Sequence, residues 1–350
     1  MAEIEKRMGS EPPHVRLRAD LAALIPDARS YVMMLLDGLG DGQLGHPAAA
    51  ALAECRVGAL DAPFPSTTTV SLATIVTGTG PKTHGLIAHL MHLPQLGRVI
   101  NTLKWVDLTG APAELDTTDF LPGPNLWERL AVAGAKCVTI QPADFAPTPT
   151  TRALYRGCHF VGAGSPAEFV SATIAAASEP GTLVFTYVPP VDYAAHVFGQ
   201  RSAEYGDAVN MAVGIWGGIA RQLPTDVTMV GTADHGVIDV EEANKVLVRD
   251  DLYRPLEFYG DPRGVMVRGS SRLIERLAAE TGCQHVDRDS LVNLLGPGPH
   301  HRWLDARLPD SILLAPPGSV LLPPGFDKRL RGYHGGLTRD ELAIPLLVAG

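Results

Sequence analysis

The feature that most constrains the fold of this chain is an alternation of short apolar runs with helix-like segments. Five runs rich in Val, Ile, Leu and Thr have the composition of buried strands: YVMMLL (31–36), CVTI (137–140), TLVFTYV (182–188), DVTMVG (226–231) and AIPLLVAG (343–350). Between them lie segments with helical periodicity: LWERLAVAG from 126, AEFVSATIAAA from 167 and AEYGDAVNMAVGIWGGIARQL from 203. This order predicts an α/β domain with a mostly parallel sheet.

The alternation is interrupted once. From about 244 to 324 the chain carries short strand candidates, one helix in SRLIERLAAE and loops rich in Pro and Gly, and then a final strand restores the first pattern. We therefore interpret 244–324 as an inserted small α+β cap, 29–243 and 325–350 as the core, and 1–28 as an N-terminal arm.

Composition excludes several classes of protein. A chain of 350 residues with 45% hydrophobic content can bury a sizeable core. The net charge of -9 is spread along the chain without a Lys/Arg block, so polymeric nucleic acid is not an expected partner. No apolar span reaches membrane length, and the charged N-terminus lacks a signal-peptide pattern, which predicts a cytoplasmic protein without membrane contact. Four dispersed cysteines without a CxxC pair predict buried free thiols: Cys55, Cys137, Cys158 and Cys283.

Carboxylates follow three of the expected strands. Asp37 comes after the first, Asp192 follows TLVFTYV and two prolines, and Asp234 follows DVTMVG. A single Asp after a strand is most often a turn former or a helix cap. Ligands of open α/β sheets bind beyond the carboxyl ends of the strands, so we expect these three side chains to converge there.

Three histidines accompany these carboxylates. Asp192 and His196 are four apart, which on a helical turn puts both on one face, and His235 directly follows Asp234. His334 lies in RGYHGGLTRD before the last strand. Six oxygen and nitrogen donors without a thiolate suit two zinc ions, with manganese as the alternative metal.

A quartet of hydroxyl residues precedes a helical pattern. In FPSTTTVSLATIVTG, residues 64–78, Ser66 to Thr69 stand between a proline and an apolar run. One interpretation is that a Ser or Thr oxygen caps the helix. The other is that one hydroxyl is a nucleophile at a helix N-terminus, where free N–H groups and the helix dipole favour an anionic substrate.

The ordered set of these motifs resembles a known family. LLDGLG, FPSTTTVSLATIVTGTGPKTHGL, VDYAAH, TADHG and YHGG, taken together from about residue 30 to the C-terminus, are similar to the alkaline phosphatase superfamily and most similar to its type I phosphodiesterase/nucleotide pyrophosphatase branch. The resemblance implies a three-layer α/β/α fold and Thr68 as nucleophile and metal ligand. It further implies one zinc held by Asp37, Asp234 and His235, and a second held by Asp192, His196 and His334.

One position departs from the expected pattern. Ser71 occupies the position where the branch usually carries an Asn that donates to a phosphoryl oxygen. A serine hydroxyl in that role donates only one hydrogen bond. Stabilisation of the oxyanion would then fall more on the backbone N–H of Thr69 and on the metals.

The resemblance implies a two-metal hydrolase that cleaves a phosphodiester or pyrophosphate bond of a small, nucleotide-like molecule through a covalent phospho-threonine. The absence of Lys and Arg from residues 64–80 favours a diester over a monoester, although Arg98 or Arg201 could supply the charge from elsewhere. The alternatives are a phosphomonoesterase or phosphonate hydrolase of the same superfamily, and a pseudoenzyme that binds a phosphorylated ligand. His84 is expected to brace its loop, and roles for His89, His92, His300 and His301 stay open.

Overall fold

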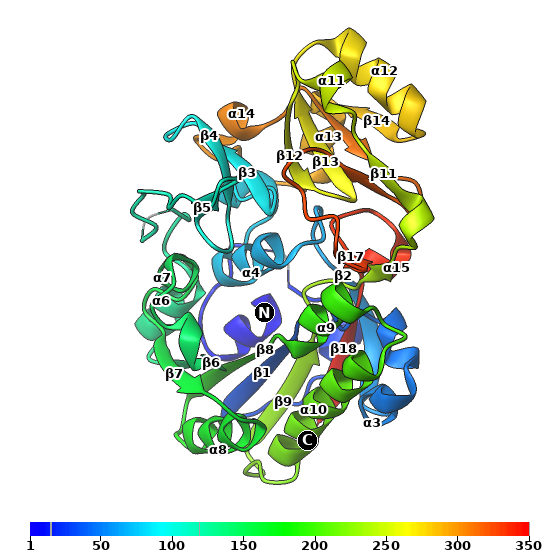
Figure 1. Ribbon diagram of the computed structural model, residues 1–350. Coiled ribbons are helices and arrows are strands. Elements are labelled where there is room, and N and C mark those ends of the chain that lie inside the picture. The colour runs from blue at the N-terminus through cyan, green and yellow to red at the C-terminus, as the bar shows by residue number, and fades with distance from the viewer. Residues whose placement is uncertain (15, 119, 350) are drawn as a thin grey trace.

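The computed structural model describes residues 1–14, 16–118 and 120–349, and its central sheet has seven strands in the order β2-β18-β9-β1-β8-β6-β7 (Figure 1). Their bounds are β1 Ser30–Leu36, β2 Arg56–Asp61, β6 Lys136–Pro142, β7 His159–Ala163, β8 Thr182–Val188, β9 Val227–Thr232 and β18 Ala343–Ala349. Strands β9, β1, β8, β6 and β7 are parallel, and β18 is antiparallel to both of its neighbours. The mostly parallel sheet is confirmed. The two strands that the sequence analysis missed, β2 and β7, are the exposed edges and lack a continuous apolar run.

Helices cover both faces of this sheet (Figure 1). In β1 every residue is buried, with Tyr31, Met33 and Leu35 facing one hydrophobic cluster and Val32, Met34 and Leu36 facing the other. The first cluster includes side chains of α4 (Thr68–Thr77), α6 (Leu126–Val132) and α7 (Pro149–Leu154). The second includes side chains of α3 (Ala50–Ala53), α8 (Pro166–Ala177), α9 (Pro190–Phe198) and α10 (Ala203–Ala220). The three-layer α/β/α fold is thereby confirmed.

A second, antiparallel sheet lies above the carboxyl ends of the central strands (Figure 1). Its seven strands, in the order β14-β15-β13-β12-β3-β4-β5, are β3 Leu90–Leu93, β4 Arg98–Asn101, β5 Val106–Asp107, β12 Glu257–Asp261, β13 Gly264–Arg268, β14 Gln284–Asp287 and β15 Ser311–Leu314. The segment that we interpreted as a cap, 244–324, supplies four of these strands. The other three come from 90–107, which the sequence analysis placed in the core, and they join the cap sheet because Leu90 pairs with Gly260.

The remaining elements lie outside the two seven-stranded sheets. They are α1 Ala2–Arg7, α2 Ala19–Ala22, α5 Pro81–His84, α11 Asp250–Tyr253, α12 Ser271–Thr281, α13 Arg288–Leu294, α14 Leu304–Arg307, α15 Arg339–Leu342, β10 Ile238–Asp239, β11 Lys245–Leu247, β16 Val320–Leu322, β17 Gly332–Tyr333 and the 3-10 turns η1 Gly42–Gly45, η2 Pro47–Ala49, η3 Ala143–Phe145 and η4 Glu242–Asn244. Helix α1 is packed onto the core through Ile4, which is buried.

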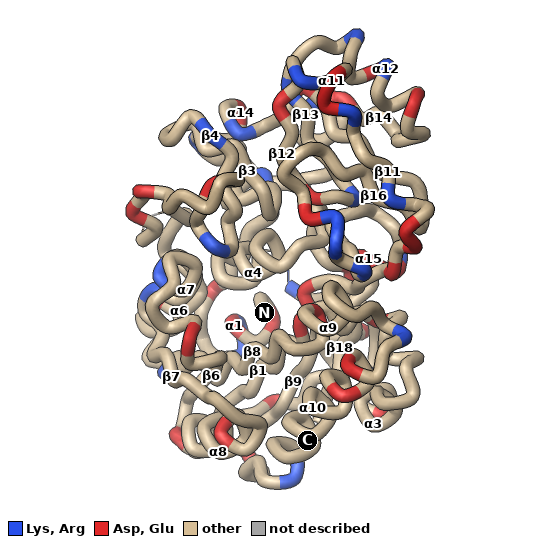
Figure 2. Tube along the Cα trace, in the orientation of Figure 1, with Lys and Arg blue, Asp and Glu red and all other residues tan. Residues whose placement is uncertain are grey.

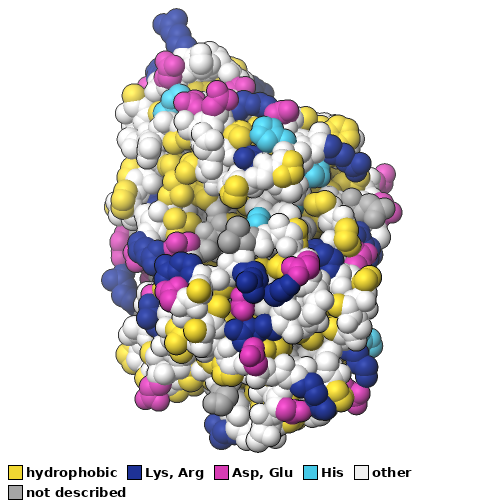
Figure 3. All heavy atoms as spheres, turned by 180° about the vertical axis from the view of Figure 1, so that it is seen from behind, with side chains coloured by type: hydrophobic (Ala, Val, Ile, Leu, Met, Phe, Trp, Pro, Cys, Tyr) yellow, Lys and Arg dark blue, Asp and Glu magenta, His cyan; other side chains and the backbone are white. Residues whose placement is uncertain are grey.

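Surface charge is mixed. Basic and acidic positions alternate along the trace in Figure 2, and on the face seen in Figure 3 Lys and Arg side chains lie among Asp and Glu side chains. All four cysteines are free, and Cys137 and Cys283 are buried whereas Cys55 and Cys158 are partly exposed. Within the described residues no helix is long and apolar enough to cross a membrane.

Candidate active site

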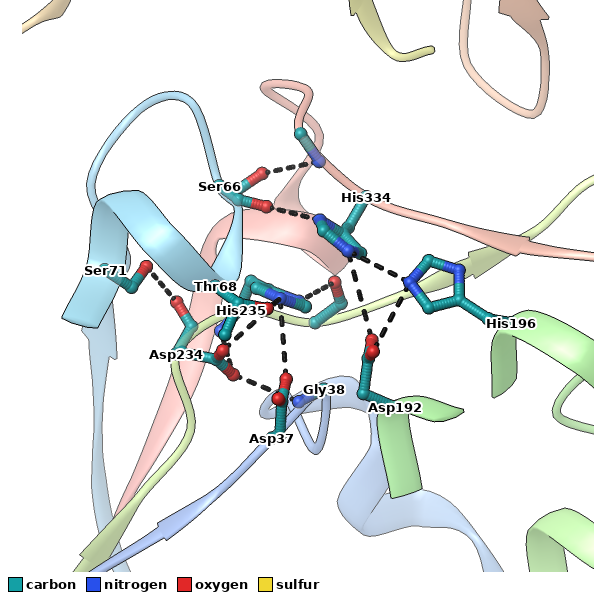
Figure 4. A network of polar contacts seen from close by, with 12 residues as sticks. Asp37, Gly38, Ser66, Thr68, Ser71, Asp192, His196, Asp234, His235 and His334 are labelled. Atoms are coloured by element: carbon teal, nitrogen blue, oxygen red, sulfur yellow. Dashed lines mark hydrogen bonds and ion pairs between the residues drawn. The ribbon is translucent and has the colours of Figure 1, made fainter. Parts of the chain in front are cut away.

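The carboxylates and histidines singled out in the sequence meet beyond the carboxyl ends of the parallel strands (Figure 4). Asp37 follows β1, Asp192 and His196 lie on α9 after β8, and Asp234 and His235 follow β9. His334 follows β17, and Thr68 is the first residue of α4. The structure therefore brings together all seven residues that we expected to hold metal ions.

A first group consists of Asp37, Asp234 and His235, which are 3%, 1% and 0% exposed. Nε2 of His235 lies 3.7 Å from Oδ1 of Asp37 and 3.4 Å from Oδ2 of Asp234. Oδ1 of Asp234 accepts from the backbone N–H groups of Gly38 and His235, each at 3.0 Å. These two bonds orient the carboxylate so that its second oxygen faces the histidine.

Glycine is required at the turn after β1. Gly38 has φ +70, and a Cβ added to it would lie 2.8 Å from Cβ of Asp192. A side chain at this position would therefore push apart the two aspartates that follow neighbouring strands.

A second group consists of Asp192, His196 and His334. Nε2 of His196 lies 3.3 Å from Oδ2 of Asp192 and 3.1 Å from Nε2 of His334, and Nε2 of His334 lies 3.9 Å from Oδ1 of Asp192. His235 is stacked on His334, with ring centroids 3.7 Å apart, and is also close enough to ligate together with Asp192 and His334. The two groups are therefore contiguous.

The tautomers of the three histidines follow from their backbone partners. Nδ1 of His196, His235 and His334 lies 2.7 Å, 3.1 Å and 2.9 Å from the carbonyl oxygens of Gly332, Gly236 and Ser66 respectively. A carbonyl oxygen only accepts, so each Nδ1 carries the hydrogen and each Nε2 is left with a lone pair. All three lone pairs point into the space between the aspartates.

This donor set fits divalent cations. One buried oxygen of each aspartate has no hydrogen-bond partner: Oδ1 of Asp37, Oδ1 of Asp192 and Oδ2 of Asp234. Burial and then the charges of Asp234 and Asp192 raise the pKa of Asp37 well above its usual value, while burial and the neighbouring His235 and His196 lower the pKa of His334. The facing lone pairs of His196 and His334 repel each other unless a cation or proton lies between them. A bound cation would be the missing partner of these oxygens and lone pairs.

Thr68 lies at the open start of α4. Its Oγ1 is 3.1 Å from Nε2 of His235, and the side chain is 7% exposed. Along α4, the N–H of Ser71 is the first that donates to a carbonyl of the helix, and its acceptor is the carbonyl of Thr67. The preceding N–H groups of α4 are the ones a helix leaves free for an anion.

The other hydroxyls of the quartet have different partners. Thr67 is the N-cap residue of α4, but its side chain makes no capping hydrogen bond. The interpretation of the quartet as a helix cap is therefore not supported. Oγ of Ser66 donates to the carbonyl of Gly336 and accepts from the N–H of Gly335, and Oγ1 of Thr69 accepts from Thr102. Ser66 and Thr69 thus fix loops around the site.

Ser71 has a different partner from the one expected. Its Oγ donates to the carbonyl of Asp234 at 2.7 Å and is buried. Because a hydroxyl has one hydrogen to donate, this bond leaves none for a phosphoryl oxygen. The contact instead holds α4 against the loop that carries Asp234 and His235.

Two further side chains adjoin the site without having been assigned a role from the sequence. The Tyr187 hydroxyl, near the end of β8, donates to Oδ2 of Asp37. Burial and then the charge of His196 lower the pKa of His89 to about 4, and Nε2 of His89 is 3.0 Å from the side-chain nitrogen of Asn101. The sequence analysis left the role of His89 open, and it missed Tyr187, which is the penultimate residue of an apolar strand.

The remaining histidines have local roles. His84 accepts from the N–H of Leu86 at Nδ1 and lies 3.1 Å from Oγ1 of Thr74 at Nε2, so it braces the turn after α4 as expected. His92 contacts Glu257 on the cap sheet, and Nδ1 of His301 accepts from the N–H of Trp303.

Comparisons with known proteins identify the family and the fold of the chain. The family model described as type I phosphodiesterase / nucleotide pyrophosphatase matches residues 31–290. Murine ectonucleotide pyrophosphatase / phosphodiesterase 5, solved as an inactive threonine-to-alanine variant in complex with AMP, is 16% identical with a TM-score of 0.70, over 91% of this chain and 87% of that chain. Phosphonoacetate hydrolase from Sinorhizobium meliloti, in complex with phosphonoformate, is 18% identical with a TM-score of 0.67, over 93% and 91%. No curated protein sequence matches the chain.

The family match spans more than half of the chain, and it includes Asp37, Thr68, Asp192, His196, Asp234 and His235. We conclude that the chain belongs to the type I phosphodiesterase / nucleotide pyrophosphatase family of the alkaline phosphatase superfamily, whose members hydrolyse phosphoric esters.

Proposed function

We propose that this protein is a two-metal hydrolase that cleaves a phosphodiester or pyrophosphate bond of a small, nucleotide-like molecule, with Thr68 as the nucleophile. The observation that carries the proposal is the position of Oγ1 of Thr68, at the start of a helix and 3.1 Å from Nε2 of His235, beside three aspartates that each keep an unpartnered oxygen. Nucleophile, anion-binding helix start and cation-binding donors thus share one space.

The residues divide into two proposed cation sites. Asp37, Asp234, His235 and Thr68 would hold one ion, and Asp192, His196 and His334 the other. Zinc is the ion we favour, with manganese as the alternative, because the donors are imidazole nitrogens and carboxylate oxygens without a thiolate. When bound, such ions lower the pKa of a coordinated hydroxyl or water and balance the charge of the phosphoryl group.

The chain's own groups then account for two steps. Oγ1 of Thr68 loses its proton to water and forms a bond to phosphorus as the bond from phosphorus to the leaving oxygen breaks, and the leaving group departs with that electron pair. A second water next attacks phosphorus from the vacated side and the bond to Oγ1 breaks. One proton of this water returns to Oγ1, which restores the threonine, and its oxygen leaves in the phosphate product. The free N–H groups at the start of α4 face the phosphoryl oxygens in both steps.

Diesters are favoured over monoesters by the positions of the arginines. Arg98 is paired with Asp107, and Arg201 with Glu241, so each of the two arginines considered for a second negative charge already has a carboxylate partner. A monoester dianion would lack the bidentate guanidinium that often accompanies it.

The second candidate is hydrolysis of a small phosphonate. The observation that favours it is the structural similarity to phosphonoacetate hydrolase from Sinorhizobium meliloti, which was solved in complex with phosphonoformate and aligns over 93% of this chain.

A substrate panel tests both candidates. The protein, stripped with chelator and reloaded with Zn²⁺ or Mn²⁺, is assayed on bis-p-nitrophenyl phosphate, the p-nitrophenyl ester of thymidine monophosphate, p-nitrophenyl phosphate and phosphonoacetate. We expect about two ions per chain, no activity after chelation, and the highest kcat/KM on a diester. The highest kcat/KM on phosphonoacetate would select the second candidate, and full activity without bound metal would refute both.

A further inference from the structure

A buried ion pair connects the cap sheet to the proposed metal centre. Arg263, in the turn between β12 and β13, is 1% exposed, and Glu341 on α15 is 0% exposed. Nε and Nη2 of Arg263 donate to the two carboxylate oxygens of Glu341 at 3.1 Å and 3.0 Å. This parallel, two-bond geometry fixes the orientation of both groups.

The arginine is held in place from the side of the cap. Its Nη1 donates to the carbonyl oxygens of three residues in the segment after β15: Ala315, Pro316 and Ser319. Every edge of the guanidinium that carries donors is therefore used. These bonds fix the orientation of the guanidinium group that binds Glu341.

Glu341 in turn binds the segment that carries His334. Oε1 of Glu341 accepts from the N–H of Gly336 at 2.8 Å, and Oε2 accepts from Oγ1 of Thr338 at 2.6 Å. A Cβ added at Gly336 would lie 2.7 Å from both carboxylate oxygens, so the backbone passes directly over the charge. The neighbouring Gly335, at φ +104, would place a Cβ 2.5 Å from Cβ of Asp261 at the end of β12.

The same segment is tied to the nucleophile loop through Ser66 (Figure 4). Its Oγ donates to the carbonyl of Gly336 at 2.9 Å and accepts from the N–H of Gly335 at 3.2 Å, and its carbonyl accepts from Nδ1 of His334 at 2.9 Å. This last bond keeps the hydrogen of His334 on Nδ1 and leaves on Nε2 a lone pair that faces Asp192 and His196. A continuous chain of contacts thus runs from Arg263 to the lone pair of His334.

We propose that Arg263 and Glu341 are positioning residues of the active site: the ion pair fixes residues 334–336 and thereby directs Nε2 of His334 to the second cation. The inference rests on the proposed function for the cation, but the orientation of His334 can be measured without one. Groups that orient a metal-bound histidine typically change metal affinity by about 10–100-fold when they are removed.

The chain offers a matched control for the loss of a buried ion pair. Arg129 and Glu5 join through two bonds of 2.6 Å and 3.0 Å, and their side chains are 11% and 2% exposed. Within the described contacts this pair touches none of the proposed metal ligands. Arg129→Met reports what a broken buried pair costs the fold alone.

The experiment compares Arg263→Met, Arg263→Lys and Arg129→Met with the wild type. Competition against a chromogenic chelator gives the two dissociation constants for Zn²⁺, and urea unfolding gives stability. We expect Arg263→Met to weaken one of the two sites by about 10–100-fold, Arg263→Lys to recover part of that loss, and Arg129→Met to leave both constants within about threefold. If Arg263→Met fails to fold, Arg263→Lys alone is expected to weaken one site measurably.

A second measurement separates this inference from the proposed function. In metal-free protein labelled with ¹⁵N-histidine, NMR is expected to report His334 as the Nδ1–H tautomer in the wild type and as a mixture in the Arg263 variants. Unchanged Zn²⁺ constants together with an unchanged His334 tautomer would overturn the inference. A wild type that binds no metal would instead refute the proposed function, and the tautomer would still decide the role of Arg263.

Discussion

Replacing each hydroxyl of the quartet in turn should separate one reagent from three structural groups. Thr68→Ala is expected to lower kcat/KM on the best diester by about 10³-fold or more, as for other covalent nucleophiles. Its cost in stability should stay below about 1 kcal/mol, because among the described residues Oγ1 of Thr68 hydrogen-bonds only with Nε2 of His235, and Thr68 is not the N-cap residue. Thr68→Ser keeps a hydroxyl and should retain measurable turnover.

Ser66→Ala is expected to lower stability more than Thr68→Ala does. It removes the donor to the carbonyl of Gly336 and the acceptor of the N–H of Gly335, both of them buried. Each unsatisfied buried group costs about 1–3 kcal/mol, so a loss of about 2 kcal/mol or more in unfolding free energy is expected. Thr67→Ala should cost little in stability, because its hydroxyl makes no capping bond at the start of α4.

The assay pairs urea unfolding with steady-state kinetics on reloaded protein, and mass spectrometry of a rapidly quenched reaction locates the phosphorylated residue. A Thr68→Ala variant with near-normal kcat/KM would refute the covalent role, and if Thr67→Ala or Thr69→Ala were inactive instead, the nucleophile would be misassigned by one position. If all four alanine variants stayed active, attack by water without a threonine intermediate would replace the proposed mechanism.

Three other substitutions test the surroundings of the site. Tyr187→Phe removes the hydroxyl that donates to Oδ2 of Asp37 and is expected to lower kcat/KM or metal affinity by about 10–100-fold, whereas unchanged values would exclude a role in orienting Asp37. Gly38→Ala should lower the unfolding free energy by about 1–2 kcal/mol and reduce activity strongly, because its Cβ would meet Asp192. The control is Gly134→Ala, at φ +87 with nothing within 4 Å of its Cβ, which should lose stability but not activity. Burial, followed by the charges of His301, Arg307 and His14, lowers the pKa of His84 to about 3. Since the unfolded chain binds this proton first, near pH 6.5, unfolding free energy should fall as the pH drops from 6.5 toward 3, by about 2 kcal/mol at pH 5, and His84→Gln should flatten that part of the curve.

The central sheet was predictable because its signals are local. A run such as TLVFTYV is buried on both faces wherever it pairs, and the observed strand has the predicted bounds, Thr182–Val188. Strand β2 gave no such signal, since it pairs only with β18 and its residues are half exposed. The pairing within the cap sheet could not be predicted, because Leu90 and Gly260 pair although they are 170 positions apart, and neither segment indicates its partner.

The candidate site shows the same division between residue type and geometry. The residue types at positions 37, 192 and 234 indicated a shared edge of the sheet, and the structure brings them together. The hydrogen bonds of the hydroxyls were not predictable, because Ser71 finds its acceptor at Asp234 and Ser66 finds its own at Gly336, far along the chain. Ser71, at the expected position of an oxyanion donor, and Ser66, a member of the hydroxyl quartet, thus both hold loops together.

The histidines show why the geometry of the site could not be predicted from the sequence. Sequence identifies an imidazole but not which nitrogen keeps the hydrogen, and in this site that choice decides whether a lone pair faces the aspartates. The three carbonyls that decide it belong to Gly332, Gly236 and Ser66, two of which lie more than a hundred positions from the histidine they orient. The metal affinity that we propose therefore depends on backbone groups that the sequence does not identify as functional. Substitutions at Arg263, which touches no proposed ligand, can measure that dependence.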